Sequence, residues 1–317
     1  MHMNGKLPLV VLTGPTAVGK TSLSIRLAHE ISAEIISADS MQVYKRMDIG
    51  TAKIRKEEMD GIPHHMIDIL EPQEDFNVTM FVGMASELVN NITDRGNIPL
   101  ITGGTGFYIQ ALLKNVMFTE EKEDSSIRRE LMEYAAANGT EALHDMLGMT
   151  DPEYAAQVHP NNIKRVIRAI EYYRQTGDKF SEHNKREALR ESPYNYAYFV
   201  LNDRRSHIYD RINKRVDIMM QDGLVNEVAS LLEEGCTTDM VSMQGLGYKE
   251  IIEYIQGKCT LDEAVDNLKQ STRHFAKRQL TWFKREKDTI WYDKSLLTDD
   301  GIIDAMKAEL KNKNIIS

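Results

Sequence analysis

The string GPTAVGKT, at residues 14–21, carries residue types that bind phosphate. It matches G-x-x-x-x-G-K-[ST] in full. An apolar run that predicts a strand precedes it, and apolar residues at helical spacing follow it. Glycines let successive backbone amides turn toward one phosphate group, and the helix N-terminus adds a favourable dipole. Lys20 supplies a positive charge, and the Thr21 hydroxyl can reach a metal ion or a phosphate oxygen. We therefore predict that a di- or triphosphate is bound by Gly14, Pro15, Thr16, Ala17, Val18, Gly19, Lys20 and Thr21.

Asp39 is a second candidate because it follows the apolar run 34–37. In α/β sheets, ligands bind at the carboxyl ends of the strands, so this acid is placed to face the phosphate-binding string. Three interpretations stay open at this point: a metal ligand, a general base that accepts a substrate proton, or a turn residue. The apolar run 98–101 is followed by TGGTG, without the acid that holds magnesium in P-loop kinases.

The elements that must position these residues alternate between strands and helices over the first 115 residues. Strand patterns lie at 9–12, 34–37, 66–70 and 98–101, and helical periods lie at 22–31 and 78–91. Such alternation is typical of a parallel sheet with helices on its faces. The fold class predicted is therefore α/β, with a P-loop NTPase-like parallel sheet flanked by helices.

The pattern changes at about residue 118, where the chain becomes charged and helical, including the periods 127–137 and 163–175. The apolar run 196–201 predicts a final strand that returns to the sheet. Helical periods follow at 206–222, 224–234, 247–256 and 261–287. We predict a catalytic core from 1–118 and 196–317, with a helical C-terminal region, interrupted by an all-helical insertion at 119–195.

Composition limits the alternatives for the whole chain. Of 317 residues, 42% are hydrophobic and 27% are charged, which excludes wholesale disorder. The two cysteines, Cys236 and Cys259, cannot build a disulfide framework or a four-cysteine zinc site, which favours a reduced, cytoplasmic setting. The early apolar run 7–12 is too short to span a membrane. Adjacent strand residues point to opposite faces, so His64 and His65 are not expected to share a metal ion.

Charge is unevenly distributed along the chain. The formal net charge is −9, yet residues 161–190 carry a net +4 and residues 269–287 a net +6. Binding depends on the local field, so these segments predict anion-binding surfaces about as well as they predict solvated helix faces. Net charge alone therefore does not exclude a nucleic-acid partner.

Seven strings in a fixed order carry a resemblance to a known family. They are GPTAVGKT (14–21), SADSMQVYKRMDIGTAK (37–53), IPHHMIDI (62–69), ITGGTGFYIQALL (101–113), HPNNIKRVIRAIE (159–171), GLGYKE (245–250) and TRHFAKRQLTWFKR (272–285). Together they resemble the bacterial tRNA dimethylallyltransferases, the IPP transferase or tRNA isopentenyltransferase family, and the resemblance runs from residue 9 to about 292. This family transfers a dimethylallyl group from dimethylallyl diphosphate to N6 of the adenosine at tRNA position 37.

The resemblance implies roles for the phosphate side of the site. The P-loop would hold an isoprenoid diphosphate, which needs no hydrolytic machinery, and Mg²⁺ would be met by the Thr21 hydroxyl. Lys20, Thr21 and the loop amides would stabilise the charge on the leaving diphosphate. Asp39 corresponds to the acid that receives the N6 proton, and Arg211 to an arginine near the diphosphate. Arg215, one helical turn away, competes for that last role.

The resemblance also implies contacts with tRNA, in particular with its anticodon stem-loop. Around the target adenosine, the implied residues are Asp39, Ser40, Met41, Gln42 and Thr105. In the insertion, they are Arg128, Lys164, Arg165, Val166, Ile167 and Arg168. Lys164 stands where the family has glutamine, which removes an amide hydrogen bond but keeps attraction to the RNA backbone. Arg165 and Arg168 are spaced i, i+3 on one helix face, which suits phosphate contacts.

Three other functions are weighed against this one. A small-molecule P-loop kinase explains the loop, but not the string 39–44 or the basic segment 269–287. An adenylate isopentenyltransferase has the same chemistry with free nucleotides as acceptors, and it has no use for the +4 segment. A non-catalytic RNA-binding module would leave Thr21 and Asp39 unused. We expect a monomer without membrane contact.

Overall fold

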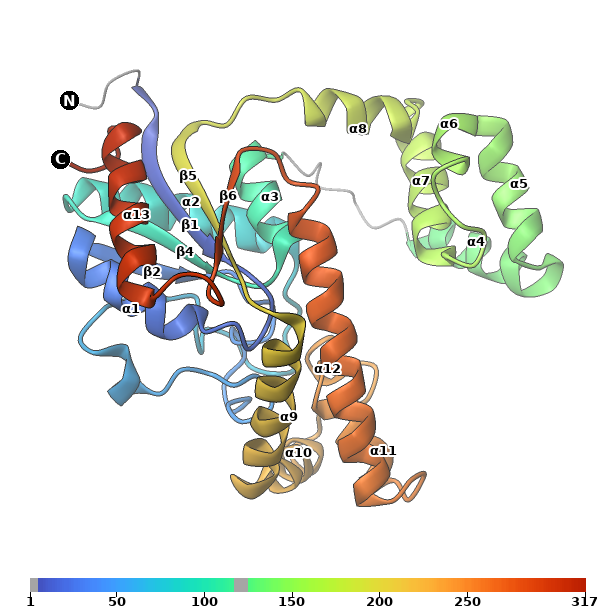
Figure 1. Cartoon of the computed structure of the whole chain (residues 1–317). Helices are drawn as coiled ribbons and strands as arrows, with labels where there is room; N and C mark the ends of the chain where they lie inside the picture. The colour runs from blue at the N-terminus through green and yellow to red at the C-terminus, as the bar shows by residue number, and fades with distance from the viewer. Residues whose placement is uncertain (1–4, 117–124) are drawn as a thin grey trace. The chain divides into compact units, whose positions relative to one another are not determined.

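The computed structural model describes residues 5–116 and 125–317, and it is built around one parallel sheet (Figure 1). Its strands lie in the order β3-β2-β4-β1-β5-β6, and every neighbouring pair is parallel. The strands are β1 (Leu7–Thr13), β2 (Ala33–Ser37), β3 (His64–His65), β4 (Ile98–Gly103), β5 (Tyr194–Asn202) and β6 (Thr289–Asp293). The predicted α/β class is confirmed.

The described helices divide between two compact units, residues 1–113 with 193–317 and residues 114–192. In the sheet-containing unit they are α1 (Lys20–Ile31), α2 (Val78–Asp94), α3 (Gly106–Lys114, whose last residue lies past the boundary), α9 (Arg205–Gln221), α10 (Leu224–Glu233), α11 (Tyr248–Ile255), α12 (Leu261–Phe283) and α13 (Asp299–Asn312). In the other unit they are α4 (Ser125–Asn138), α5 (Thr140–Thr150), α6 (Pro152–Ala155), α7 (Ile163–Thr176) and α8 (Phe180–Ala188). Short 3₁₀ turns lie at Lys56–Met59 and Ser242–Gln244.

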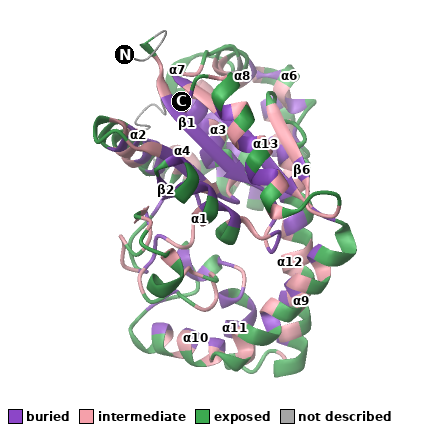
Figure 2. Cartoon of the chain, turned by 60° about the vertical axis from the view of Figure 1, so that its left-hand side comes forward, coloured by how far each residue is buried: buried purple, intermediate pink, exposed green. Residues whose placement is uncertain are grey.

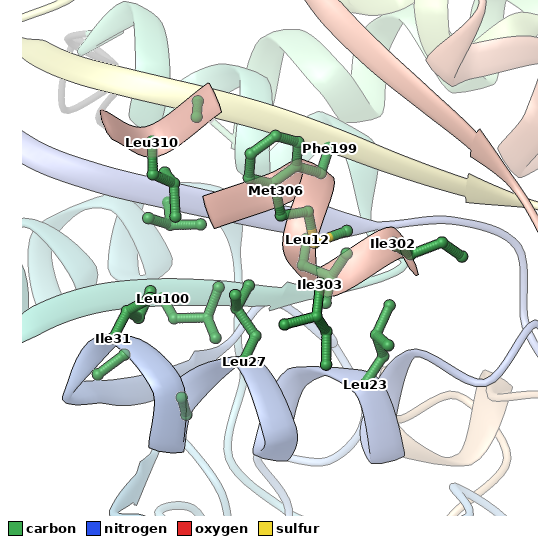
Figure 3. Packing of buried hydrophobic residues seen from close by; sticks show 14 of the residues in the cluster. Leu12, Leu23, Leu27, Ile31, Leu100, Phe199, Ile302, Ile303, Met306 and Leu310 are labelled. Carbon is green, nitrogen blue, oxygen red and sulfur yellow. The ribbon is translucent and has the colours of Figure 1, made fainter. Parts of the chain in front are cut away.

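One face of the sheet is covered by α1 and α13, which are packed against the same apolar side chains (Figure 3). Alternate strand residues such as Val10, Leu12 and Leu100 meet Leu23 and Leu27 of α1, all of them fully buried. The four inner strands, β2, β4, β1 and β5, are buried through most of their length (Figure 2), as expected for a parallel sheet with helices on its faces, whereas the edge strands β3 and β6 are mostly half-buried. This rigid core holds the carboxyl edge of the sheet in place.

Local sequence signals explain where the site-forming helices begin. α1 starts directly after Gly19, whose φ of 93° ends the phosphate-binding loop in a left-handed conformation. α12 begins with a capping box, in which the Thr260 hydroxyl accepts from the Glu263 amide and the Glu263 carboxylate accepts from the Thr260 amide. α12 is tied to α9 by an Arg273–Asn213 hydrogen bond of 2.7 Å.

The helical unit has a core of its own. Its buried side chains come from α4, α5, α6, α7 and the segment after α6, and they are Leu131, Ala135, Leu143, Leu147, Ala155, Val158, Val166, Ile167, Ala169 and Ile170. Arg128 of α4 donates to the buried Glu171 of α7 through Nε at 3.0 Å and Nη2 at 2.8 Å. This unit therefore has the features of a separate domain: its own hydrophobic core and a bidentate ion pair that joins two of its helices.

Several sequence predictions of elements are corrected. The strand predicted at 66–70 is instead the two-residue β3 at His64–His65, because Met66 and Asp68 adopt positive φ and leave the ladder. The run 196–201 is not the final strand, since β6 follows it, and α12 ends at Phe283 rather than at 287.

The predicted insertion, 119–195, includes the first two residues of β5, whereas the helical unit spans 114–192. The predicted residues 119–124 lie outside the described ones. Over residues 5–116 and 125–317, no helix combines the length and the apolar character needed to cross a membrane.

Candidate functional site

The predicted phosphate-binding loop, residues 14–21, connects β1 to α1, and the side chain of Lys20 points toward the backbone of this loop. Lys20 Nζ donates to the carbonyls of Gly14 and Pro15, each at 2.9 Å. A Cβ added to Gly19 would lie 3.0 Å from the Lys294 ammonium, so a second cation stands beside the helix N-terminus. The loop therefore places Lys20 and the N-terminus of α1 at the carboxyl edge of the sheet, an arrangement that suits an anion, and the binding of phosphate by residues 14–21 stays a prediction.

The electrostatics of Lys20 are those of a crowded cation site. Burial and the nearby Arg215 guanidinium lower the pKa of Lys20 to about 7, and the Asp39 carboxylate opposes this shift. Burial and Arg211 likewise lower the pKa of Arg215. Binding of an anion would relieve the repulsion between Lys20 and Arg215, whereas Arg211 and Lys294 already have counter-ions in Asp203 and Asp299.

Asp39 lies at the end of β2, where the chain is pressed against the turn after β4. A Cβ on Gly103 would overlap the Ala38 carbonyl, so only glycine permits this approach. The Thr105 amide donates to the Ala38 carbonyl at 3.2 Å, and the Ser40 amide donates to the Thr105 hydroxyl at 3.3 Å. The structure thus brings Asp39, Ser40 and Thr105 together, as the sequence predicts.

The Asp39 carboxylate is half-buried, and its charge interacts with that of the Lys20 ammonium. Its Oδ1 accepts the Met41 amide at 2.9 Å, which fixes its orientation. Burial raises the pKa of Asp39, although the Met41 amide and the Lys20 ammonium pull that pKa down. A carboxylate with a raised pKa beside an anion site is suited to accept a proton during group transfer.

Gln279 of α12 connects the two halves of the site, a role that sequence reasoning missed. Its Oε1 accepts the Thr16 amide of the phosphate-binding loop at 2.8 Å, and its Nε2 donates to the Gly104 carbonyl at 2.9 Å. The side chain is 5% exposed, so neither hydrogen bond is shared with bulk water. It lies within the string 272–285 that carried the family resemblance, but the string alone does not show these contacts.

Two arginines of α9 hold the loop from its other side. Arg211 Nε donates to the Ala17 carbonyl at 2.7 Å, and Nη2 donates to Asp203 Oδ2 at 2.6 Å. Arg215 Nη1 lies 3.5 Å from the Thr16 hydroxyl. In this structure, Arg211 is engaged with the loop backbone, whereas the Arg215 guanidinium reaches a side chain of the predicted phosphate-binding string.

Residues 38–53, here called the β2 loop, contain the predicted acceptor residues Met41 and Gln42. Gln42 Nε2 donates to the carbonyls of Thr51 and Ala52, at 3.3 and 3.4 Å. The Lys53 ammonium is buried within the loop, where it donates to the Tyr44 carbonyl at 2.7 Å and to Asp48 at 2.6 Å. The conformation of the β2 loop is therefore fixed by hydrogen bonds between its own residues.

In the helical unit, the predicted RNA-contact residues fall into two groups. Lys164, Arg165 and Arg168 are exposed on α7. Val166 and Ile167, also predicted to bind tRNA, are 0% and 4% exposed in the core of this unit, so their side chains do not form part of its surface. The guanidinium of Arg128, a further candidate, lies against Glu171.

No group of three metal-binding side chains occurs among the residues that the structure describes. His65 Nε2 lies 2.7 Å from Glu34, and His64 Nδ1 lies 2.8 Å from the Ile62 carbonyl. Thr21 is exposed in the first turn of α1. Mg²⁺ keeps several waters and binds largely through substrate phosphates, so one exposed hydroxyl beside an anion site fits its requirements.

The fold and this site define a P-loop α/β protein with a half-buried carboxylate, that of Asp39, beside its P-loop. Two sequence families match it: the description "IPP transferase" covers residues 42–286, and "Isopentenyl transferase" covers residues 7–70. A tRNA dimethylallyltransferase of Lachnoclostridium phytofermentans is 56% identical over 98% of this chain and 99% of its own. The chain belongs to the IPP transferase family, as the resemblance implied.

Solved structures agree with this assignment. A tRNA isopentenylpyrophosphate transferase of Bacillus halodurans is 43% identical, with a TM-score of 0.74 over 98% of both chains. A tRNA delta(2)-isopentenylpyrophosphate transferase of Staphylococcus epidermidis is 44% identical, with a TM-score of 0.71 over 96% of this chain and 99% of its own. A eukaryotic dimethylallyltransferase acting on tRNA is 29% identical, with a TM-score of 0.84 over 98% of this chain and 79% of its own.

Proposed function

We propose that this chain transfers a dimethylallyl group from dimethylallyl diphosphate to N6 of the adenosine at tRNA position 37, on the 3′ side of the anticodon. The observation that carries the proposal is the pairing of Lys20 and Asp39, an anion site and a proton acceptor whose charges interact at one edge of the sheet. Membership of the IPP transferase family supports it. A kinase lacks this support, because β4 ends in Gly103 without a magnesium-binding acid.

In the proposed reaction, N6 of adenosine forms a bond with C1 of the donor while the C1–oxygen bond breaks. The diphosphate leaves with that electron pair, and the loop amides and the Lys20 ammonium stabilise its charge. The N6 proton passes to the Asp39 carboxylate, whose raised pKa makes it a better acceptor at neutral pH. Arg215, with its guanidinium directed at Thr16, is a better candidate than Arg211 for a direct phosphate contact.

The site also suits a divalent cation. The Thr21 hydroxyl, exposed at the N-terminus of α1, would hold Mg²⁺ together with the donor phosphates and water. When bound, the ion would add positive charge against the leaving diphosphate.

The acceptor side is proposed to consist of Asp39, Ser40, Met41, Gln42 and Thr105 of the sheet-containing unit. An adenine amine reaches a site at the edge of a sheet only after its base leaves the anticodon stack. Lys164, Arg165 and Arg168, exposed on α7, are proposed to bind RNA phosphates, which would make tRNA affinity dependent on salt. We propose that the enzyme works as a single chain in the cytoplasm.

The proposal is tested with purified protein, Mg²⁺, prenyl-labelled dimethylallyl diphosphate and an anticodon stem-loop carrying adenosines at positions 36, 37 and 38. Label is expected in the RNA, and nucleoside analysis is expected to identify it as N6-dimethylallyl-adenosine. A matched stem-loop with guanosine at position 37 is expected to stay unlabelled. Transfer to free adenine nucleotides alone would favour the adenylate isopentenyltransferase, and phosphoryl transfer from ATP without prenylation would favour the kinase.

A further inference from the structure

Three consecutive backbone amides of the β2 loop donate to one carboxylate outside the loop, that of Glu227 on α10. Glu227 Oε2 accepts the backbone amides of Asp48 at 2.9 Å and Ile49 at 2.7 Å, and Oε1 accepts the Gly50 amide at 3.0 Å. Three consecutive amides that converge on one anion form a nest, and hydrogen bonds to a charged acceptor are stronger than neutral ones. Glu227 thus constrains the loop segment 48–50, together with the hydrogen bonds that the Ala52 and Lys53 amides donate to the carbonyls of Ile49 and Asp48.

Tyr248 of α11 completes this arrangement. Its hydroxyl donates to Glu227 Oε1 at 2.7 Å, and its ring packs so closely on Gly50 that a Cβ there would overlap it. Burial, followed by the Glu227 charge, raises the pKa of the Tyr248 hydroxyl, so the hydroxyl remains a donor. The carboxylate therefore receives four hydrogen bonds, three from the loop and one from the helix that supports the loop.

The effect of Glu227 reaches the acceptor residues through the loop's internal contacts. Gln42 donates to the carbonyls of Thr51 and Ala52, directly after the segment that Glu227 holds. The Met41 methyl lies against Gly245, between α10 and α11, where a Cβ would overlap it. A shift of the segment 48–50 would displace the partners of Gln42 without touching the phosphate-binding loop.

We propose that Glu227 is a positioning residue for acceptor recognition, which holds the β2 loop in the conformation that presents Met41 and Gln42 to the target RNA. This inference rests on the proposed function of the site. It assigns Glu227 no contact with the substrate and no part in donor binding. Removing the carboxylate should therefore weaken RNA binding selectively.

The test compares Glu227→Gln with Glu233→Gln, a matched loss of one charge from an exposed position of the same helix. An amide places an N–H group against amides that need an acceptor, so Glu227→Gln should speed hydrogen exchange at residues 48–50. It should raise the dissociation constant for an anticodon stem-loop about tenfold, which corresponds to one lost charge-assisted hydrogen bond. Affinity for inorganic diphosphate should not change. Glu233→Gln should match the wild type throughout.

Glu227→Asp keeps the charge on a shorter side chain and should recover part of the RNA affinity. Tyr248→Phe removes one donor and keeps the three loop amides, so it should have a smaller effect and is informative if Glu227→Gln does not fold. The inference would be overturned if hydrogen exchange at residues 48–50 and RNA affinity were the same in Glu227→Gln as in Glu233→Gln. It would also be overturned if Glu227→Gln lost as much affinity for diphosphate as for RNA. Hydrogen exchange needs no substrate, so it tests the loop contact even if the wild type fails to prenylate RNA.

Discussion

Donor binding should depend on pH through Lys20, because its pKa in the ligand-free protein is lowered to about 7. A diphosphate anion favours the ammonium form, so its binding raises the pKa of Lys20 and takes up a proton. Affinity should therefore be full below pH 7 and should fall as the pH rises above it. With half of the lysines protonated at pH 7 and about one in eleven at pH 8, the dissociation constant should rise about fivefold over that interval.

The assay is calorimetric titration with inorganic diphosphate at pH 6.5, 7, 7.5 and 8, in buffers of different ionisation enthalpy. The matched variant is Lys20→Arg, whose guanidinium stays protonated over the whole range. Subtracting its pH dependence removes the titration of the diphosphate itself. The expected result is that the wild type takes up about one half of a proton more than the variant near pH 7. Identical pH dependence in both proteins would refute the lowered pKa of Lys20.

Three further predictions concern RNA binding, the bridge across the site and packing. Arg165→Ala with Arg168→Ala should weaken stem-loop binding and reduce the slope of log affinity against log salt by about 1.5, with donor affinity unchanged; an unchanged slope would exclude phosphate contacts. Gln279→Leu should lower kcat for prenyl transfer about tenfold to a hundredfold, because it uncouples Thr16 from Gly104, and a wild-type kcat would show the bridge to be dispensable. Gly103→Ala should lower the free energy of unfolding in urea by about 1–3 kcal/mol. Gly83→Ala, exposed in α2 with open space around it, should raise that free energy by about 0.5–1 kcal/mol, so equal effects would contradict the close approach at Gly103.

Sequence reasoning was most successful where the interactions are local. The string 14–21 joins the end of β1 to the start of α1, the strand-to-helix position that its flanking patterns predicted. The spacing of Arg165 and Arg168 predicts one helix face, and both side chains are exposed on α7. The buried Val166 and Ile167 lie between them because an amphipathic helix turns its intervening residues toward the core.

Contacts between distant segments were not predictable in the same way. Gln279 meets Thr16 across 263 residues, and Glu227 meets Gly50 across 177. β6 was missed because it is a short edge strand: its apolar run, Ile290–Tyr292, is only three residues long, and only Tyr292 is buried. The run 66–70 resembles a strand, yet the amides of Asp68 and Ile69 donate to the carbonyls of Gln42 and Val43. The conformation of this run is therefore determined by hydrogen bonds to a distant segment and not by local strand propensity.

In the proposed reaction, the Asp39 carboxylate accepts the N6 proton beside a phosphate loop that holds the donor. Single-turnover prenyl transfer by Asp39→Asn tests this step, because asparagine keeps an oxygen to accept the Met41 amide and loses only the basic group. We predict that the rate falls about a hundredfold to ten-thousandfold, while the affinities for inorganic diphosphate and the stem-loop stay at wild-type values. A wild-type rate, or a slow rate explained by lost stem-loop affinity, would contradict the claim.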